Sequence, residues 1–329
     1  MATASDPTTL TYKLAGDHEI KLDLYRPAGA GPCPVVVWLH GGALIAFSRH
    51  SIHERQGILE ALLEAGLAVA AIDYRLAPET KLPEILTDVQ DAFGWVQQHG
   101  AEYQLDPDRV GVLGLSAGGY LTLMSAFMVS PKPKALVSFY GYGDLTGDWY
   151  ARPDAFYNSL GAIPAEEAWS AVGTATISEP DLPSSLARIR YYHWTRQQGA
   201  WPTHVAGTHP LTDLAAFTPW CPLQNIHAEW PPTLLLHGTA DTDVPFEQSV
   251  MMLDALTAAG ASAKLITLAG APHVFDRGVT LADLTATPPT PVAQACAESV
   301  AFLIRHLTDA SVASSESSWP GPQADLASL

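Results

Sequence analysis

The chain has 329 residues, of which 47% are hydrophobic and 16% are charged, and its formal net charge is −17 at pH 7. This length allows one large hydrophobic core, or one core with a cap. No run of apolar residues approaches the roughly 18–20 that a membrane span requires. The negative charge argues strongly against a nucleic-acid partner, because an acidic surface repels phosphate groups, and weakly against an anionic membrane surface.

The first predicted elements are strands. Apolar and polar residues alternate over residues 10–14 and 20–25, on either side of a Gly-Asp pair, which is typical of an antiparallel hairpin. The continuous apolar run at 34–40 is typical of a strand buried on both faces. Residues 52–64 have the apolar spacing of a helix.

Strands and helices then alternate along the chain. The pattern predicts a strand over 67–74, a helix over 83–99, a strand over 109–115, a helix over 117–128 and a strand over 135–140. After a long interruption come a strand over 232–237, a helix over 245–259, a strand over 263–268 and a helix over 291–307. This alternation predicts an α/β fold, with a doubly wound, mostly parallel sheet and helices on both faces.

The interruption between Gly143 and Trp230 is rich in Trp, Tyr, His and Pro, with short helical patterns around 165–172 and 186–197. It is too long for a loop of a compact domain and too aromatic for a disordered linker. We therefore interpret residues 144–230 as an inserted cap on a core formed by residues 1–143 and 231–310. Residues 311–329, rich in Ser, Ala and Pro, are predicted to be a flexible C-terminal tail.

A candidate nucleophile lies in the motif Gly-Leu-Ser-Ala-Gly at 114–118, between a predicted strand and a predicted helix. This is the context of the G-x-S-x-G nucleophile elbow, in which a sharp turn holds the serine above the sheet. Only small residues fit two positions on either side of Ser116. A helix N-cap serine in a glycine-rich turn is the structural alternative.

A candidate oxyanion hole follows the buried strand at 34–40, in the motif His-Gly-Gly-Ala at 40–43. The backbone N–H groups of Gly41, Gly42 and Ala117 are predicted to bind the negative oxygen that develops during acyl transfer. A simple glycine turn at the end of a strand is the alternative. His40 itself is expected to be a structural hydrogen-bonding residue.

Two further loops supply an acid and a base. Asp241 follows the predicted strand at 232–237, and His273 follows the strand at 263–268. The chain order Ser, Asp, His is that of α/β-hydrolase triads, in which the histidine takes the serine proton and the acid orients it. Asp243 is a rival acid, but the D-x-x-V-P spacing favours Asp241. The histidines of the insert are expected to be core or surface residues, not metal ligands; they include His193, His204 and His209.

Together these motifs resemble the α/β-hydrolase superfamily, and most of all its hormone-sensitive-lipase-like (α/β-hydrolase fold-3) esterases. The matching segments are 40–42 (HGG), 73–79 (DYRLAPE), 114–119 (GLSAGG), 237–241 (HGTAD) and His273. The resemblance implies cofactor-free hydrolysis of carboxylic esters through an acyl-enzyme. Two positions depart from that pattern: Ala43 replaces a third glycine, and Leu115 replaces the usual aspartate before the nucleophile.

We therefore expect a serine esterase acting on small to medium, apolar or aromatic substrates, without cofactor or metal. The substrate pocket is predicted from residues beside the oxyanion motif and aromatic residues of the insert, namely Ala43, Leu44, Phe47, Trp149, Tyr192 and Trp201. The aromatic residues alternatively form the insert's own core. A lactonase, an aryl-amidase or a small-peptide hydrolase would use the same triad, and an inactive binding protein is a remote alternative.

The three cysteines, Cys33, Cys221 and Cys296, cannot all pair and have no metal-ligand spacing. The N-terminal nine residues lack the basic and apolar regions of a secretory signal. These features predict a reduced, cytoplasmic protein whose partner is a small-molecule ester. The sequence does not indicate an oligomeric state.

Overall fold

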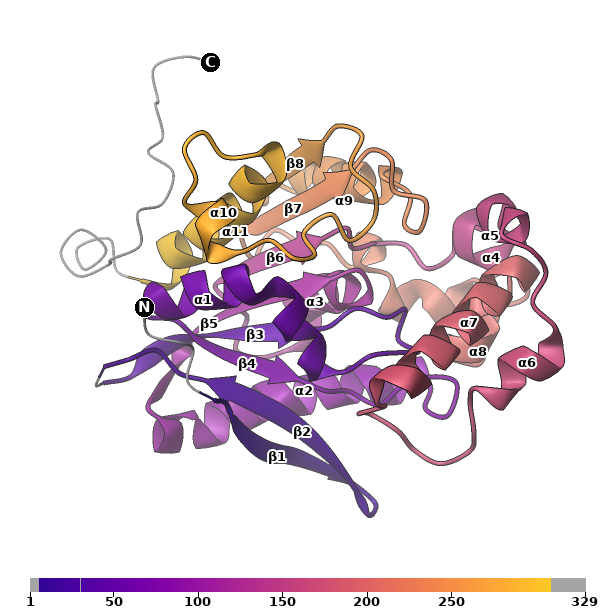
Figure 1. Cartoon of the computed structure of the whole chain (residues 1–329), viewed down its shortest axis with the longest axis horizontal. Coiled ribbons are helices and arrows are strands. Elements are labelled where there is room, and N and C mark those ends of the chain that lie inside the picture. Colours follow the sequence, from indigo (N-terminus) through magenta and orange to yellow (C-terminus); the bar gives the residue numbers. More distant parts are fainter. Residues whose placement is uncertain (1–5, 30, 309–329) are drawn as a thin grey trace.

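The computed structural model describes residues 6–29 and 31–308. One eight-stranded sheet runs through this part of the chain in the order β1-β2-β4-β3-β5-β6-β7-β8 (Figure 1). The first two strands form the predicted antiparallel hairpin, and β2 also pairs antiparallel with β4. All later neighbours are parallel. The strands are β1 (Thr8–Ala15), β2 (His18–Tyr25), β3 (Cys33–Leu39), β4 (Ala68–Ile72), β5 (Leu105–Leu115), β6 (Ala135–Phe139), β7 (Thr233–Gly238) and β8 (Ala263–Leu268). The predicted mostly parallel α/β sheet is confirmed.

The sheet separates two apolar cores because successive side chains of a strand point to opposite faces. Val35 and Val37 of β3 lie in the core that contains side chains of α2 (Leu82–His99), α3 (Ala117–Met128) and α9 (Glu247–Ala258). Val36 and Trp38 lie in the other, with side chains of α1 (Gln56–Glu64), α10 (Leu281–Leu284) and α11 (Pro291–Leu307). Every residue of β3 is buried, as its continuous apolar run predicts.

One predicted helix is divided. Residues 52–64 form part of a 3₁₀ helix, η1 (Arg49–Arg55), followed by α1. The helix breaks at Arg55, which has φ −126° and ψ 38° and directs its guanidinium to the buried Asp276 at 2.9 Å. A second short 3₁₀ helix, η2 (Gly100–Tyr103), follows α2.

The predicted insert is helical. Its helices are α4 (Asp148–Ala151), α5 (Ala155–Ser159), α6 (Ala165–Ser170), α7 (Leu182–Gln198), α8 (Trp201–Ala206), η3 (Ala215–Trp220) and η4 (Pro222–Gln224). The helices α4 to α8 gather at one end of the sheet (Figure 1). Its division from the core at 144–230 stays a prediction, and the predicted tail at 311–329 lies outside the described residues. Within residues 6–29 and 31–308, the helices are too short or too polar to cross a bilayer.

Candidate active site

Ser116 occupies a strained turn between β5 and α3. Its backbone angles, φ 55° and ψ −117°, lie in a region that residues other than glycine rarely adopt. Such strained conformations are common in functional turns. The turn requires glycine on both sides. A Cβ at Gly114 would lie 2.1 Å from the Gly118 carbonyl oxygen, and one at Gly118 would lie 2.0 Å from the Leu39 carbonyl oxygen. The predicted strand–turn–helix context of the serine is therefore present.

His273 and Asp241 meet this serine from two other loops. His273 Nε2 lies 3.1 Å from Ser116 Oγ, and His273 Nδ1 lies 2.6 Å from Asp241 Oδ2. Since a carboxylate only accepts, Nδ1 carries the proton and donates to Asp241, which leaves Nε2 free to accept from the serine hydroxyl. The Asp241 side chain is fully buried. The structure thus brings together the three residues predicted from separate motifs.

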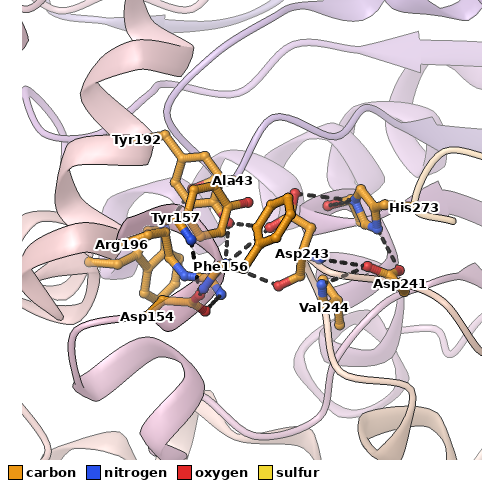
Figure 2. A network of polar contacts seen from close by, with 12 residues as sticks. Ala43, Asp154, Phe156, Tyr157, Tyr192, Arg196, Asp241, Asp243, Val244 and His273 are labelled. Carbon is orange, nitrogen blue, oxygen red and sulfur yellow. Dashed lines mark hydrogen bonds and ion pairs between the residues drawn. The ribbon is translucent and has the colours of Figure 1, made fainter. Parts of the chain in front are cut away.

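Backbone and side-chain donors fix the Asp241 carboxylate (Figure 2). Its Oδ1 accepts the N–H groups of Asp243 and Val244 at 2.8 and 2.9 Å, and its Oδ2 also accepts from His237 Nε2 at 3.1 Å. Burial alone would raise the pKa of Asp241, but the hydrogen bonds from His237 and His273 hold that pKa well below its usual value. The D-x-x-V spacing therefore selects Asp241, since residues two and three positions later supply its backbone donors.

The imidazole of His273 is surrounded by acidic groups. Burial would lower the pKa of His273, but the carboxylates of Asp243 and Asp241 outweigh it and raise this pKa above its ordinary value. The Tyr140 ring packs edge-on against the imidazole, with centroids 4.5 Å apart. The Tyr140 hydroxyl donates to the buried carboxylate of Asp276 at 2.5 Å. These contacts make His273 a stronger base than a free imidazole.

The predicted oxyanion loop lies directly against the nucleophile. A Cβ at Gly41 would come within 3.0 Å of the Leu115 carbonyl oxygen and 3.4 Å of Ser116 Cβ. Gly42 has a φ of 105°, and a Cβ there would lie 2.1 Å from the Ala46 carbonyl oxygen. Only glycine allows this approach. Ala117 is the first residue of α3, so its N–H has no acceptor within the helix.

Three non-glycine residues of this loop have left-handed backbone conformations: Ala43, Leu44 and Phe47, with φ of 57°, 62° and 68°. Hydrogen bonds from residues outside the loop hold the carbonyl groups of Ala43 and Leu44. Trp201 Nε1 donates to the Ala43 carbonyl at 3.0 Å, and the Ala77 N–H donates to the Leu44 carbonyl at 2.8 Å. These contacts over-determine a conformation that the loop residues alone disfavour.

The DYRLAPE segment supports the same loop. The Tyr74 ring stacks on His40 at 4.1 Å, and its hydroxyl donates to the His40 carbonyl at 2.8 Å. Burial lowers the pKa of His40 to about 4, so this histidine is neutral and structural, in line with its predicted role. Glu79 forms an ion pair at 2.7 Å with Arg188 of α7, and Arg188 Nε donates to the Ile45 carbonyl at 2.5 Å. Contacts from both the insert and the DYRLAPE segment therefore hold the oxyanion loop in place.

A cavity of about 310 Å³ opens onto Ser116. Of the predicted pocket residues, Ala43, Phe47 and Tyr192 line it, as do Gly41, Gly42, Ser116 and His273. Across the described ranges, no cluster of three or more His, Cys, Asp or Glu side chains is arranged to hold a metal ion.

Leu44, Trp149 and Trp201, which are also predicted for the pocket, are not among the residues that line this cavity. Leu44 and Trp201 are fully buried in the core. The left-handed backbone at Leu44 accompanies a side chain packed in that core. Trp149 and Trp201 stack on Tyr150 at 3.6 and 4.0 Å between ring centroids. Trp149 and Trp201 thus pack against another aromatic ring of the insert, which favours the alternative of an aromatic core there.

The motif analysis missed most of the remaining lining. Leu186, Ile189 and His193 of α7 face the cavity at helical spacings of three and four, a stripe that the sequence pattern contained. Ser51, Glu54 and Arg55 of η1 also line the cavity, and so do residues at strand ends and in the loops beside them, namely Leu115, Tyr140, Asp243, Val274 and Arg277. Tyr140 ends a predicted strand, Val274 follows His273 and Asp243 is predicted only as a rival acid, whereas the segment around Glu54 carried no catalytic signal.

A buried arginine links the insert to the loop after β7, which carries Asp241 and Asp243 (Figure 2). The side chain of Arg196 in α7 is 1% exposed and pairs with Asp154 at 2.6 Å and with Asp243 at 3.0 Å. Its guanidinium carbon lies 4.6 Å from the centroid of the Tyr157 ring and 5.0 Å from that of Tyr150. Aromatic faces and two carboxylates together compensate this buried charge.

This sheet, with a serine on a sharp strand–turn–helix bend and an acid and a histidine on later strand-end loops, defines an α/β hydrolase. A family model described as BD-FAE matches residues 22–256. The chain therefore belongs to the BD-FAE family, and its predicted place in the α/β-hydrolase superfamily is confirmed.

Solved structures share this fold. An α/β hydrolase superfamily protein from Enterococcus faecalis is 24% identical, with a TM-score of 0.70 over 91% of this chain and 98% of that chain. A thermophilic carboxylesterase cloned from a metagenomic library is 21% identical, with a TM-score of 0.64 over 93% of this chain and 90% of that chain.

Curated relatives are much longer proteins. A non-reducing polyketide synthase of Aspergillus calidoustus is 28% identical over 91% of this chain, and the 5-methylorsellinic acid synthase of Aspergillus terreus is 29% identical over 93%. The match spans 14% of the length of each of these two proteins. The chain is thus similar to one part of each synthase.

Proposed function

We propose that the chain is a serine esterase that cleaves carboxylic esters through an acyl-enzyme formed on Ser116. The observation that carries this proposal is the hydrogen-bond chain from Asp241 through His273 to Ser116 Oγ. It ends at a hydroxyl that faces a cavity and stands beside glycine backbone. A serine hydroxyl is a weak nucleophile unless a positioned base removes its proton, and this chain provides one.

In the proposed acylation step, Ser116 Oγ attacks the ester carbonyl carbon while His273 Nε2 accepts the hydroxyl proton. Asp241 holds the tautomer with the proton on Nδ1 and stabilises the imidazolium. The N–H groups of Gly41, Gly42 and Ala117 are the proposed donors to the developing oxyanion. The imidazolium then gives its proton to the leaving alcohol, and the carbon–oxygen ester bond breaks.

In deacylation, a water molecule replaces the alcohol and gives its proton to His273 as its oxygen attacks the acyl carbon. Ser116 Oγ leaves and recovers the proton from the imidazolium, and the carboxylic acid departs. The raised pKa of His273 supports both steps, because a stronger base takes the proton more readily from serine and from water. The proposed chemistry requires only groups of the chain and water.

The cavity favours small to medium substrates with an apolar or aromatic part. Its volume of about 310 Å³ is at the lower end of the range usual for small-molecule sites. Phe47, Leu186 and Ile189 supply apolar surface beside Ser116.

Labelling with a fluorophosphonate probe tests the serine mechanism, with Ser116→Ala as the matched variant. The wild type should be labelled and should hydrolyse short aryl esters. Ser116→Ala should fold, remain unlabelled and lose several orders of magnitude in turnover. An unlabelled wild type, or full activity in Ser116→Ala, would end the proposal.

A second candidate substrate is an acyl thioester of polyketide type. The names of the curated relatives favour it, since those proteins are polyketide synthases and the match covers nearly the whole of this chain. The same steps apply, with a thiol as leaving group. Matched oxygen ester, thioester and amide of one aromatic acid discriminate the candidates. A thioester advantage larger than its advantage in alkaline hydrolysis would support this one.

A cytoplasmic location also stays a proposal. Cys33, Cys221 and Cys296 are free and buried, so each is shielded from oxidants by packing. Free thiols are typical of reducing compartments.

A further inference from the structure

Asp243 presents one carboxylate oxygen to the cavity beside the nucleophile. Its Oδ1 accepts hydrogen bonds from the Tyr192 hydroxyl and from Arg196 Nη1, the latter at 3.0 Å. Its backbone N–H donates to Asp241 at 2.8 Å, so the residue is held on both sides. Its Oδ2 lies 3.6 Å from His273 Nε2, beyond hydrogen-bond distance, and has no hydrogen-bond partner among the described residues.

The carboxylate is ionised in this environment. Burial opposes its charge, but His273, Arg196 and Tyr192 lower the pKa of Asp243 below its usual value. An ionised carboxylate only accepts hydrogen bonds, so Oδ2 needs a donor. Leaving a cavity-lining charged oxygen without a donor after the substrate displaces water is costly. A substrate that carries a suitable donor avoids this cost.

The position of Oδ2 defines where that donor must be. His273 Nε2 is 3.1 Å from Ser116 Oγ and 3.6 Å from Asp243 Oδ2, so the same nitrogen adjoins the nucleophile and the carboxylate. The ester carbonyl and the leaving oxygen must come next to these atoms during the reaction. A donor that reaches Oδ2 is therefore attached within a few bonds of the scissile ester.

We propose that Asp243 Oδ2 binds a hydroxyl group of the substrate next to the scissile bond, so that the enzyme prefers hydroxylated esters. This inference rests on the proposed esterase function and narrows its substrate class. A neutral hydroxyl fits better than a cation, because Arg196, which Asp243 shares with Asp154, already partly neutralises the carboxylate, and a hydroxyl costs less than a cation to remove from water. The neighbouring wall, formed by Leu186 and Ile189 of α7, is apolar.

Two matched ester pairs test the proposal through the ratio of kcat/KM. The alcohol-side pair is 2-hydroxyethyl and 2-methoxyethyl butanoate; the acyl-side pair is methyl 2-hydroxybutanoate and methyl 2-methoxybutanoate. Each ratio is normalised to alkaline hydrolysis. The wild type should prefer the hydroxyl member of at least one pair by about tenfold or more, because a site built for a donor rejects an analogue without one.

Asp243→Asn should abolish or reverse this preference. The amide oxygen keeps the hydrogen bonds from Tyr192 and Arg196, so the amide NH₂ must take the place of Oδ2 and become a donor. An ether oxygen then serves as well as a hydroxyl. Tyr192→Phe is the control, because it alters the same wall but keeps the carboxylate, and it should keep the sign of the preference.

The outcomes separate this inference from the proposed function. Equal ratios in both pairs, for a wild type that is labelled by fluorophosphonate and hydrolyses ethyl butanoate, overturn the role of Asp243 alone. A preference that survives in Asp243→Asn overturns it as well. A larger kcat/KM for butanoylcholine than for 2-hydroxyethyl butanoate overturns the hydroxyl assignment in favour of a cation. Absence of labelling and of all turnover ends the proposed function, and this inference with it.

Discussion

The sheet and the insert contribute to the cavity in different ways. At the sheet, the chemical groups stand on loops that directly follow strands: Ser116 after β5, Asp241 after β7 and His273 after β8. In the insert, one helix supplies the cavity wall, with Leu186, Ile189, Tyr192 and His193 on α7. The other aromatic side chains of the insert pack mainly on each other and around Arg196.

We infer from this difference that the reaction depends on the sheet loops, whereas the choice of acyl chain depends mainly on the insert. The sheet positions its groups with backbone hydrogen bonds, such as those from residues 243 and 244 to Asp241. Two buried arginines of α7 hold the insert to the sheet. Arg188 donates to the Ile45 carbonyl of the oxyanion loop, and Arg196 pairs with Asp243 of the loop after β7. Changes to Ser116, Asp241 or His273 should affect the rate of every substrate, whereas changes in the insert should affect stability or the ranking of acyl chains.

The largest expected effect is at the sheet. Asp241→Asn should lower kcat by up to about ten-thousandfold, and Asp243→Asn by far less. In the Asp241→Asn variant the new amide oxygen would accept the two backbone N–H groups. The amide NH₂ would then face His273 Nδ1 and force the tautomer that cannot accept the serine proton. Steady-state kinetics on an aryl ester measures this. The reverse order of the two variants would assign the acid to Asp243.

A stability change tests the attachment of the insert. Arg196→Met should lower the free energy of unfolding by about 3–5 kcal/mol, because it leaves Asp154 and Asp243 without their buried partner. Arg152→Met is the matched control, since Arg152 is 57% exposed and its pair with Asp148 should contribute at most about 1 kcal/mol. Urea denaturation compares them. Equal losses would show that Arg196 does not anchor the insert.

Substrate ranking separates the wall of the cavity from the packing behind it. Leu186→Ala or Ile189→Ala should change the relative kcat/KM of short and long acyl esters, by the equivalent of about 1–3 kcal/mol in activation free energy. Trp201→Phe should keep the parent's ranking and should lower stability and the rate on all esters alike, because Trp201 stacks on Tyr150 and donates to the Ala43 carbonyl but does not line the cavity. A panel of acyl esters of graded length provides the measurement. Altered ranking in Trp201→Phe alone would contradict the assignment of the wall.

The smallest expected effect is on pH dependence. Protonated His273 cannot accept the serine proton, so kcat/KM should fall as the pH drops through its raised pKa, above the ordinary imidazole value. Burial opposes the imidazolium, whereas Asp243 favours it through its charge, Asp241 through a hydrogen bond and its charge, and Asp276 through its charge. Asp243→Asn should therefore move this acid limb to lower pH. The exposed Glu102→Gln should leave the limb in place; a shift there, or none in Asp243→Asn, would contradict this account.

Local patterns along the chain predict the parallel sheet and the order of its elements. They also identify the three residues that meet at the cavity. Each depends on local patterns, since a buried strand has a continuous apolar run and a sharp turn needs small residues beside Ser116. The carboxyl ends of parallel strands share one edge of the sheet, so groups on these loops converge although they are far apart in sequence.

The side chains of the insert that reach the cavity are determined by how its helices pack in three dimensions. Leu186 and Trp201 are both large apolar residues of the insert, yet Leu186 lines the cavity and Trp201 is fully buried in the core. Their directions depend on how α7 docks, which is set by contacts such as that of Arg188 with Ile45, 143 positions away along the chain. The same docking brings Tyr192 and Arg196 to Asp243 and turns its second oxygen toward the substrate. No local pattern encodes such a contact, because its geometry exists only once the insert has packed against the sheet.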